Sequence, residues 1–322
     1  MRFPLLKLVP DNTNIDFLRW RVFAIIVSLV LIAASVFFLA TKGLNLGVDF
    51  VGGQSVRATF SQPVQLDELR GRISGLGVGE PSIQTFGNNR TVSIRLPLPE
   101  GGENAASAAA RRVSQVVTEG YPGARIDAVE TVSGKVSNEL YRQGAISLLL
   151  AMIGISMYIW IRFEWQFGVG ALVSLVHDLT IVLGFYAVTQ IEFSLNGVAA
   201  LLTLIGFSLN DTVVVYDRIR ENLKKYRKMA IEPLLNLSVN ETLGRTIATN
   251  TAVLLAVLGL VVFGPDVIFD LTIGILVGVI IGTYSSVYVA RFLLVPLGVG
   301  PDSFVPANTS NAERISDDGA RV

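Results

Sequence analysis

The sequence predicts a polytopic α-helical membrane protein with six transmembrane helices and one α+β domain between the first two. Hydrophobic residues make up 51% of the 322 residues and charged residues only 16%, against about a quarter in an average soluble domain. Six apolar runs are each long enough to cross a bilayer core, which requires about 20 helical residues. Between the first two runs, about 100 residues of mixed polarity predict a separate folded domain.

The six runs divide the chain in order. We expect transmembrane helices at residues 22–41, 141–161, 167–190, 194–217, 245–265 and 269–292. The first run is expected to remain as an anchor, because it is longer than the apolar core of a signal peptide. The other parts are an N-terminal segment (1–21), the domain (42–140), a basic loop (218–240) and a polar tail (299–322) that we expect to be disordered.

Lysines and arginines predict the orientation of the chain in the membrane. They cluster before the first run and between the fourth and fifth, whereas the short loops around Glu192 and Asp266 contain none. Positive residues mark the cytoplasmic side, so both termini are expected in the cytoplasm and the domain outside it. The basic stretch Arg218–Lys228 is expected to be helical and to lie against anionic lipid or to meet a partner.

The extracytoplasmic segment has the pattern of a ferredoxin-like domain. Alternating apolar residues predict strands at 55–60, 81–86, 91–96 and 124–131, with helices at 66–76 and 105–119. Residues 87–90, Gly-Asn-Asn-Arg, predict a hairpin turn. The order β-α-β-β-α-β is the split βαβ arrangement, which does not by itself indicate an activity.

Composition excludes several kinds of site. The chain has no cysteine and one histidine, which argues against disulfides, iron–sulfur clusters, thiol nucleophiles and zinc sites. It has no phosphate-binding loop and no serine-nucleophile motif. The 26 Lys and Arg residues balance the 26 Asp and Glu residues, so no strongly basic nucleic-acid surface is predicted. We therefore expect a transport protein, not an enzyme, with no cofactor or metal and with an ion gradient as its energy source.

Ionisable residues inside the predicted spans are the most informative, because burying them in a bilayer is costly. Asp211 lies in the fourth span, where we favour a protonatable transport residue over a structural carboxylate paired with a neighbouring helix. Arg245 opens the fifth span in a polar stripe with Thr242, Thr246 and Thr249. It is the expected counter-charge for Asp211, although an arginine near a helix end can also reach the lipid headgroups.

The third span contains two further ionisable residues, His177 and Asp178. Asp178 is a second candidate for the proton pathway, with a purely structural role as the alternative. Adjacent residues on a helix point about 100° apart, so we do not expect the two to form a dyad. His177 is expected to be a hydrogen-bonded interior residue.

Two glycine patterns stand out. Gly274, Gly278 and Gly282 recur every four residues in the sixth span, and small residues at this spacing let another helix approach closely. Residues 47–53, Gly-Val-Asp-Phe-Val-Gly-Gly, follow the first span and predict a tight turn or a functional hinge. The candidate motif residues in this segment are Gly47, Asp49, Phe50, Gly52 and Gly53.

Four motifs together resemble those of a known family. They are residues 47–53, Val176–Thr180 (VHDLT), Leu209–Asn222 (LNDTVVVYDRIREN) and Ser238–Thr246 (SVNETLGRT). Over nearly its whole length the chain is similar to the SecF members of the SecD/SecF protein-export family. One helix, an external domain and five further helices also resemble one half of an RND-type transporter.

The resemblance implies a function in protein export. SecF pairs with SecD and docks on the SecYEG channel, with other Sec accessory membrane proteins as further contacts. The pair uses the proton-motive force to promote translocation of unfolded exported polypeptides across the bacterial cytoplasmic (inner) membrane, after the ATP-driven steps. By position, Asp211 matches the family's proton-pathway aspartate and Arg245 its associated arginine. The aspartate that SecD contributes to that pathway is not in this chain.

Two other functions remain open at this point. The chain could be a non-conducting structural subunit that stabilises SecD and the channel, in which case Asp211 and Arg245 only hold helices together. It could also be half of an RND-type exporter of small molecules. The second is disfavoured because such exporters generally have larger external domains than about 100 residues.

Overall fold

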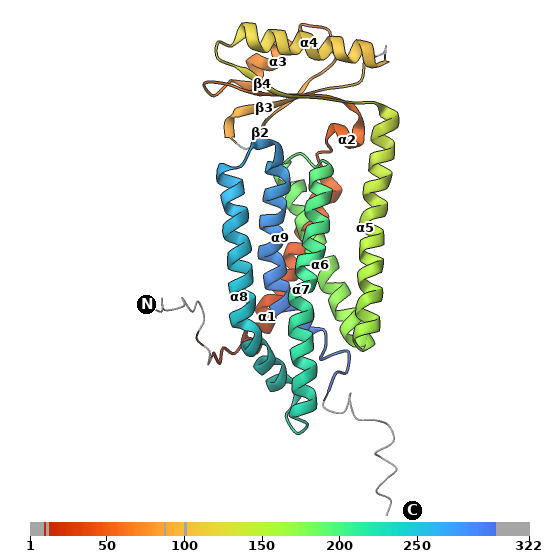
Figure 1. Ribbon diagram of the computed structural model, residues 1–322, viewed down its shortest axis with the longest axis vertical. Coiled ribbons are helices and arrows are strands. Elements are labelled where there is room, and N and C mark those ends of the chain that lie inside the picture. Colours follow the sequence, from red (N-terminus) through yellow and green to blue (C-terminus); the bar gives the residue numbers. More distant parts are fainter. Residues whose placement is uncertain (1–9, 11–12, 87, 100–101, 301–322) are drawn as a thin grey trace, which may run out of the picture.

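The computed structural model describes residue 10 and residues 13–300 except 87 and 100–101, and it shows a bundle of long helices capped at one end by a small sheet domain (Figure 1). The expected disordered tail lies outside the described residues from 301 onward. Gly87, the first residue of the expected hairpin turn, also lies outside them.

Six of the described helices are long and apolar enough to cross a membrane. They are α1 (Arg21–Thr41), α5 (Gly134–Arg162), α6 (Trp165–Thr189), α7 (Leu195–Lys225), α8 (Ile231–Phe263) and α9 (Phe269–Val287), which continues into the short α10 (Val289–Phe292). Helices suit these apolar runs because every backbone polar group is then bonded within its own segment, as a bilayer requires.

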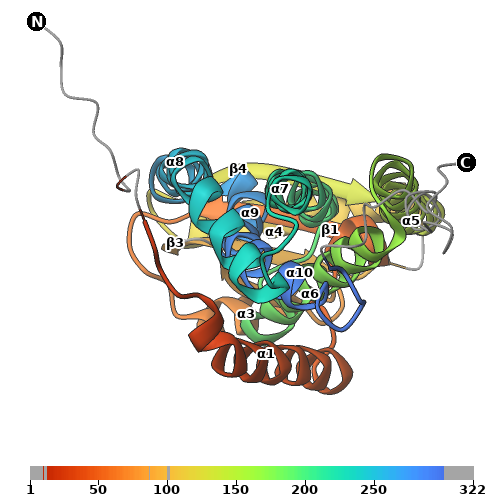
Figure 2. The ribbon, with the colours of Figure 1, turned by 90° about the horizontal axis from the view of Figure 1, so that it is seen from below.

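The bundle has a centre and a periphery (Figure 2). In the most apolar stretch of α6, 61% of the residues are buried inside the protein, against 11% in α5. Helices α7 and α9 are also among the more buried, whereas α1 and α8 expose most of their apolar side chains. Polar side chains in the middle of the spans therefore gather where α6, α7 and α9 meet.

The helix ends have recognisable local causes. The Ser133 hydroxyl accepts a hydrogen bond from the Val136 amide and caps α5, and Ser194 caps α7 through the Asn196 amide. Helix α6 ends at Gln190, which adopts a left-handed conformation with φ of 56°.

The segment 218–240, expected as a basic loop with a helical stretch at its start, is helical over most of its length. Helix α7 continues through Lys225 and α8 begins at Ile231, so only residues 226–230 form the connection. Hydropathy locates the point where a helix leaves the bilayer, but Arg, Lys, Glu and Leu are good helix formers and let the helix continue beyond it.

The extracytoplasmic domain realises the predicted β-α-β-β-α-β order. Its strands β1 (Gly53–Thr59), β2 (Ser82–Phe86), β3 (Asn88–Leu96) and β4 (Arg125–Val132) form an antiparallel sheet in the order β2-β3-β1-β4. Helices α3 (Leu66–Ser74) and α4 (Gly102–Gly120) cover the face that points away from the bundle (Figure 1). The core joins Val56 and Ile94 of the sheet to Leu69 and Val113 of the helices.

Polar contacts tie this domain to the bundle. The Arg95 guanidinium donates a 2.6 Å hydrogen bond to the carbonyl of Leu46, in the segment that leaves α1. On the other side, Thr91 donates to Asp266 in the α8–α9 connection at 2.6 Å. The sheet is thus fixed over the outer ends of the helices, with its open face toward the membrane.

Candidate functional site

Asp211 lies on α7 inside the bundle, with 3% of its surface exposed. The Asn250 side chain of α8 donates a hydrogen bond to Asp211 Oδ2 at 2.7 Å and another to Thr283 Oγ1 of α9 at 2.6 Å. A buried carboxylate is costly unless it is hydrogen-bonded. The partner that the structure gives Asp211 is a neutral amide, and the contact joins three helices.

Arg245 lies on an exposed side of α8, and no ion pair joins it to Asp211 in the part of the chain that the structure describes. Helical geometry explains the difference from the expected pair. Thr246 and Asn250 are four residues apart and face the bundle, whereas Arg245 and Asn250 are five apart and point about 140° from each other. The structure therefore gives Asp211 a hydrogen bond to Asn250, whereas Arg245, on an exposed side of α8, interacts with Asp211 through its charge without forming an ion pair.

Asp178 is fully buried on α6 and is hydrogen-bonded to three side chains. Ser208 of α7 and Ser285 of α9 donate to Asp178 Oδ2 at 2.6 and 2.7 Å. Asp178 Oδ1 lies 2.8 Å from His177 Nδ1. The expectation that His177 and Asp178 do not form a dyad was wrong, because the 100° separation applies to the Cα–Cβ bonds and the imidazole reaches back to its neighbour.

The far side of His177 continues this chain of contacts. His177 Nε2 lies 3.1 Å from Ser28 Oγ of α1, and Ser28 Oγ lies 2.9 Å from the Tyr284 hydroxyl of α9. Tyr284 donates to the carbonyl of Ala24 on α1 at 2.6 Å. Sequence reasoning did not single out these hydroxyl residues, because a serine in a span can also bond to its own helix and so gives a weak signal.

The two carboxylate centres are neighbours, since α7 and α9 contribute to both. Ser208 and Asp211 are three residues apart on α7, and Thr283 and Ser285 are two apart on α9. The glycine series of α9 faces these helices: a side chain at Gly278 would meet Leu204 and one at Gly282 would meet Ser208. The close approach of α9 to α7 is what places hydroxyl groups within hydrogen-bonding distance of the carboxylates.

Residues 47–53 join the domain to the start of α7. Residues Val48–Val51 form the short helix α2, and Gly52 and Gly53 then take φ values of 72° and 124°. Asp49 accepts a hydrogen bond from the Leu195 amide at 2.9 Å, and the Phe50 ring stacks on Phe193. This segment is therefore a tight turn and also one of the contacts between the domain and the bundle.

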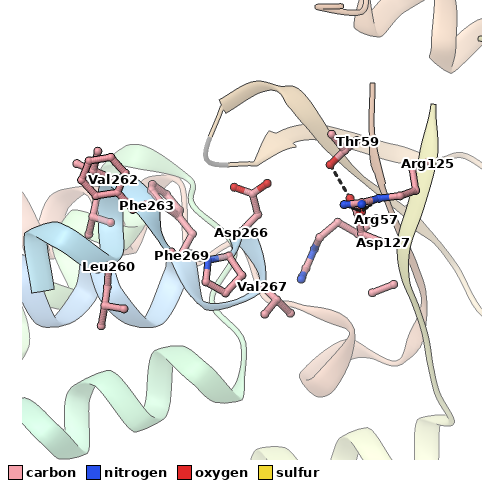
Figure 3. A pocket seen from close by; sticks show the side chains of 14 residues that line it. Arg57, Thr59, Arg125, Asp127, Leu260, Val262, Phe263, Asp266, Val267 and Phe269 are labelled. Carbon is pink, nitrogen blue, oxygen red and sulfur yellow. Dashed lines mark hydrogen bonds and ion pairs between the residues drawn. The ribbon is translucent and has the colours of Figure 1, made fainter. Parts of the chain in front are cut away.

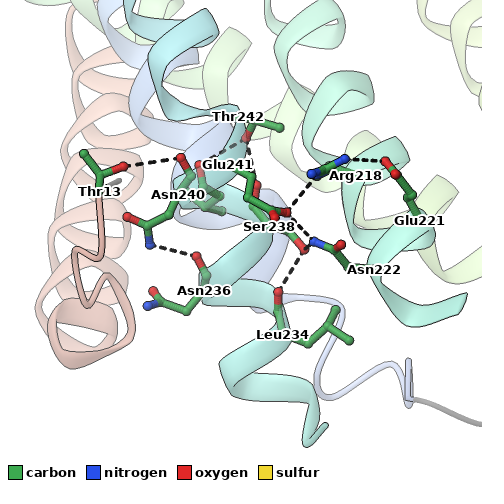
Figure 4. A network of polar contacts seen from close by, with 11 residues as sticks. Thr13, Arg218, Glu221, Asn222, Leu234, Asn236, Ser238, Asn240, Glu241 and Thr242 are labelled. Carbon is green, nitrogen blue, oxygen red and sulfur yellow. Dashed lines mark hydrogen bonds and ion pairs between the residues drawn. The ribbon is translucent and has the colours of Figure 1, made fainter. Parts of the chain in front are cut away.

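At the opposite end of the bundle, a polar network links α7 and α8 (Figure 4). Glu241 accepts hydrogen bonds from Arg218 Nε at 2.8 Å and from Asn222 Nδ2 at 2.6 Å. Asn236 and Asn240 bond to the extended segment before α1 through the backbone of Phe17 and Ile15. The motif segments 209–222 and 238–246 thus meet here, and part of the basic stretch is paired within the chain.

A cleft of about 720 Å³ separates the open face of the sheet from the α8–α9 connection (Figure 3). Arg57, Thr59, Arg125 and Asp127 line it from β1 and β4, and residues 260–267 and Phe269 line it from below. Its size falls within the range of about 300–1,000 Å³ typical of ligand sites. Phe263 at its rim is 89% exposed, so apolar and charged groups are both available there.

Within the described ranges, no group of three or more His, Asp or Glu side chains is arranged to hold a metal ion.

Comparisons with known proteins give a consistent result. Residues 112–299 match the family described as protein export membrane protein SecD/SecF, C-terminal, and residues 37–64 match the SecD/SecF GG motif. The chain is 42% identical to the protein translocase subunit SecF of Rhodobacter capsulatus, over 91% of this chain and 92% of that protein. It is 41% identical to the SecF subunit of Pseudomonas aeruginosa, over 91% and 94%.

Solved structures agree. The fold matches the crystal structure of SecDF, a translocon-associated membrane protein from Thermus thermophilus, with a TM-score of 0.82 and 32% identity over 90% of this chain. The chain spans 39% of the length of that SecDF chain. A structure of SecDF in a super-membrane-facing form matches with a TM-score of 0.66. The chain therefore belongs to the SecD/SecF family of protein export membrane proteins, as a multi-pass membrane subunit accessory to the Sec translocase.

Proposed function

We propose that this subunit couples the proton-motive force to the export of unfolded polypeptides, with Asp211, Asp178 and Arg245 in the proton pathway. The observation that carries the proposal is the Asp211 centre, a buried carboxylate in the middle of a span whose hydrogen-bond partner is the neutral Asn250. In such a site the ionised carboxylate is much more costly to bury than the protonated acid. Binding or release of a proton therefore changes the free energy of this helix arrangement.

Polar side chains on the outer face of α7 and α8 support SecD as the partner. Thr203 and Asn210 of α7 and Arg245 and Thr249 of α8 are exposed in this chain although they lie within the spans. Polar side chains in a span face protein or water, not lipid. Strand β4, an edge of the sheet, lies on the same side (Figure 2). We infer that SecD covers this face and contributes the acidic group that Arg245 meets.

The remaining parts of the proposal concern location and substrate. We propose that both termini lie in the cytoplasm, the domain in the periplasm and the spans in the bacterial inner membrane, where the SecYEG channel lies. The distribution of Lys and Arg along the chain supports this orientation. The cleft under the sheet, with its apolar rim and arginines, is a suitable contact for an extended polypeptide that leaves the channel.

The energetics are compatible with proton coupling. One proton that crosses a potential of about 150 mV releases roughly 3.5 kcal/mol. A near-complete swing between two conformations requires about 5.5 kcal/mol. Two protons in each cycle, which release about 7 kcal/mol, exceed this requirement, whereas one proton falls short of a complete swing.

The test replaces Asp211 by asparagine in cells that depend on this subunit. An asparagine can still accept the Asn250 hydrogen bond through its own oxygen, so the fold is retained while the titratable group is lost. Asp217→Asn, on the same helix but exposed and paired with Arg162 at 3.0 Å, is the matched control. Precursor accumulation and co-purification of SecD are measured in the same cells.

We expect Asp211→Asn to retain SecD but to accumulate precursor proteins inside the cell, and Asp217→Asn to do neither. Normal secretion by an intact Asp211→Asn complex would contradict proton coupling through Asp211. It would favour the alternative in which the chain is a non-conducting structural subunit.

A further inference from the structure

The chain of hydrogen bonds around His177 fixes which atoms carry protons. A tyrosine hydroxyl has one hydrogen, and Tyr284 uses it on the Ala24 carbonyl at 2.6 Å, because a carbonyl can only accept. The 2.9 Å contact between Ser28 and Tyr284 must then use the hydrogen of Ser28. Ser28 has no second hydrogen, so in its 3.1 Å contact with His177 it accepts from Nε2.

The same reasoning determines the state of the His177–Asp178 pair. With Nε2 protonated, the 2.8 Å contact between His177 Nδ1 and Asp178 Oδ1 still requires a hydrogen. It is either on Nδ1, which makes an imidazolium beside a carboxylate, or on Oδ1, which makes a neutral imidazole beside a carboxylic acid. If this proton is lost, two lone pairs face each other at 2.8 Å, and a buried hydrogen bond is lost as well.

We propose that His177 and Asp178 form a single proton-binding unit, that the unit holds one proton in this conformation, and that loss of the proton loosens α1 from the bundle. The inference rests on the proposed function, since it adds a second proton site to the pathway. Ser208 donates to Asp178 Oδ2 and lies one turn before Asp211 on α7. Through Ser208, the pair is therefore connected to the helix that carries the Asp211 centre.

Helix α1 is the element that senses this proton. Its buried residues are Ala24, Ser28 and Ser35, and the first two belong to the hydrogen-bond chain. Without the proton, His177 keeps a hydrogen bond to Asp178 only if Nε2 loses its hydrogen. Ser28 must then turn its own hydrogen to His177, and the Tyr284 contact breaks. From its far end, α1 leads through residues 42–47 into α2 and β1, so a shift of α1 reaches the extracytoplasmic domain.

Few other titratable groups lie near the His177–Asp178 pair, and a groove beside α1 gives that helix room to move. The other titratable groups in the hydrogen-bond chain and the adjoining groove are Tyr284 and Tyr288 at the end of α9. On α7, Asp211 lies one turn beyond Ser208, and α1 has no ionisable side chain between Arg21 and Lys42. A groove of about 420 Å³ opens beside Ser28 and His177, between α1, α6 and α9. Its lining is almost entirely apolar, so α1 can shift there without breaking further polar contacts.

The single histidine of the chain makes a direct test feasible. This subunit is labelled with ¹⁵N-histidine, assembled with its unlabelled partner in lipid, and studied by solid-state NMR, with the His177→Gln complex as the blank. We expect a protonated Nε2 at neutral pH and a hydrogen shared between Nδ1 and an acid. A neutral ring with hydrogen on Nδ1 and none on Nε2 would overturn the proposal, because that ring donates to an ionised Asp178 and no proton is stored.

Tyr284→Phe tests the cause without altering either titratable group. It removes the hydroxyl that forces Ser28 to accept from Nε2, so the Nδ1-protonated ring is expected to appear. An unchanged spectrum would contradict the role of the chain of hydroxyls. Tyr216→Phe, which removes a different buried tyrosine hydroxyl bonded to the Ala290 carbonyl, is the control and is expected to leave the spectrum as in the wild type.

Export measurements separate this inference from the proposed function. In vesicles, His177→Gln is expected to lose most of the pH dependence of the late translocation step, with SecD retained. If Asp211→Asn stops that step and His177→Gln keeps the wild-type pH profile, the inference fails while the proposed function stands. If neither variant changes it, the proposed function fails as well, whatever the histidine spectrum shows.

Discussion

Gly184→Ala is expected to displace α1 from α6 at their closest approach. A β-carbon at Gly184 would lie 2.6 Å from Ser35 Cα and would also overlap Ser35 Cβ. Carbon atoms pack best at about 3.5–4.0 Å, so α1 must shift by roughly 1 Å. One of the obstructing atoms belongs to the backbone, so a change of rotamer cannot relieve the clash.

The magnitude follows from where α1 lies. Overpacking usually costs about 1–3 kcal/mol, and a peripheral helix can yield, so we expect a loss of about 1–2 kcal/mol in unfolding free energy. The assay is unfolding of the purified complex in mixed micelles, with the distance between spin labels on two introduced cysteines reporting the α1 shift. The absence of native cysteine makes this labelling specific.

Gly154→Ala is the matched control, because a β-carbon on that α5 glycine would meet nothing within 4 Å. Alanine favours a helix over glycine by about 0.5–1 kcal/mol, so the control is expected to be slightly more stable than the wild type. If Gly184→Ala matches the control in stability and leaves the label distance unchanged, the close packing of α1 on α6 is refuted.

Two further predictions concern the junction between the domain and the bundle. Burial raises the pKa of Glu192, an effect that nearby Arg95 opposes, so its contribution to stability is lost as pH rises above the unfolded-state value of about 4.3. Glu192→Gln should therefore melt like the wild type in acid and higher than it at neutral pH, and a constant difference between the two would contradict this. Gly53→Ala should lower the unfolding free energy by about 1–3 kcal/mol, because its β-carbon would lie 2.5 Å from the Leu96 carbonyl oxygen at a φ of 124°. It should also speed proteolysis of the domain. Gly77→Ala, which has a positive φ but open space around it, should do so less.

The positions of the spans and the order of the domain follow from local patterns. Uncharged runs such as 22–41 correspond closely to helices, here Arg21–Thr41, because hydropathy and length are properties of the run itself. Alternation predicted the strand at 124–131, observed as Arg125–Val132, for the same reason. Such signals need no knowledge of what packs against the segment.

The partners of the buried carboxylates could not be predicted in the same way. Whether Asp211 meets Asn250 or Arg245 depends on the rotation of α8 about its axis, which is set by packing across the bundle. The His177–Asp178 contact depends on side-chain torsions, and its continuation to Ser28 depends on the position of α1. Sequence shows which residues must be satisfied in the membrane, but the three-dimensional arrangement selects the partner.

Asp178 and Arg245 differ in whether this chain alone satisfies their polar groups. Both oxygens of Asp178 are bonded to side chains of this subunit, so its environment is complete here. Arg245 lies on an exposed face within a span, where an arginine facing lipid would be costly. The chain spans 39% of the SecDF chain that it resembles, and a partner half can supply the missing surface. We therefore expect variants at Asp178 to act on the isolated subunit, and variants at Arg245 to act only once the partner is bound.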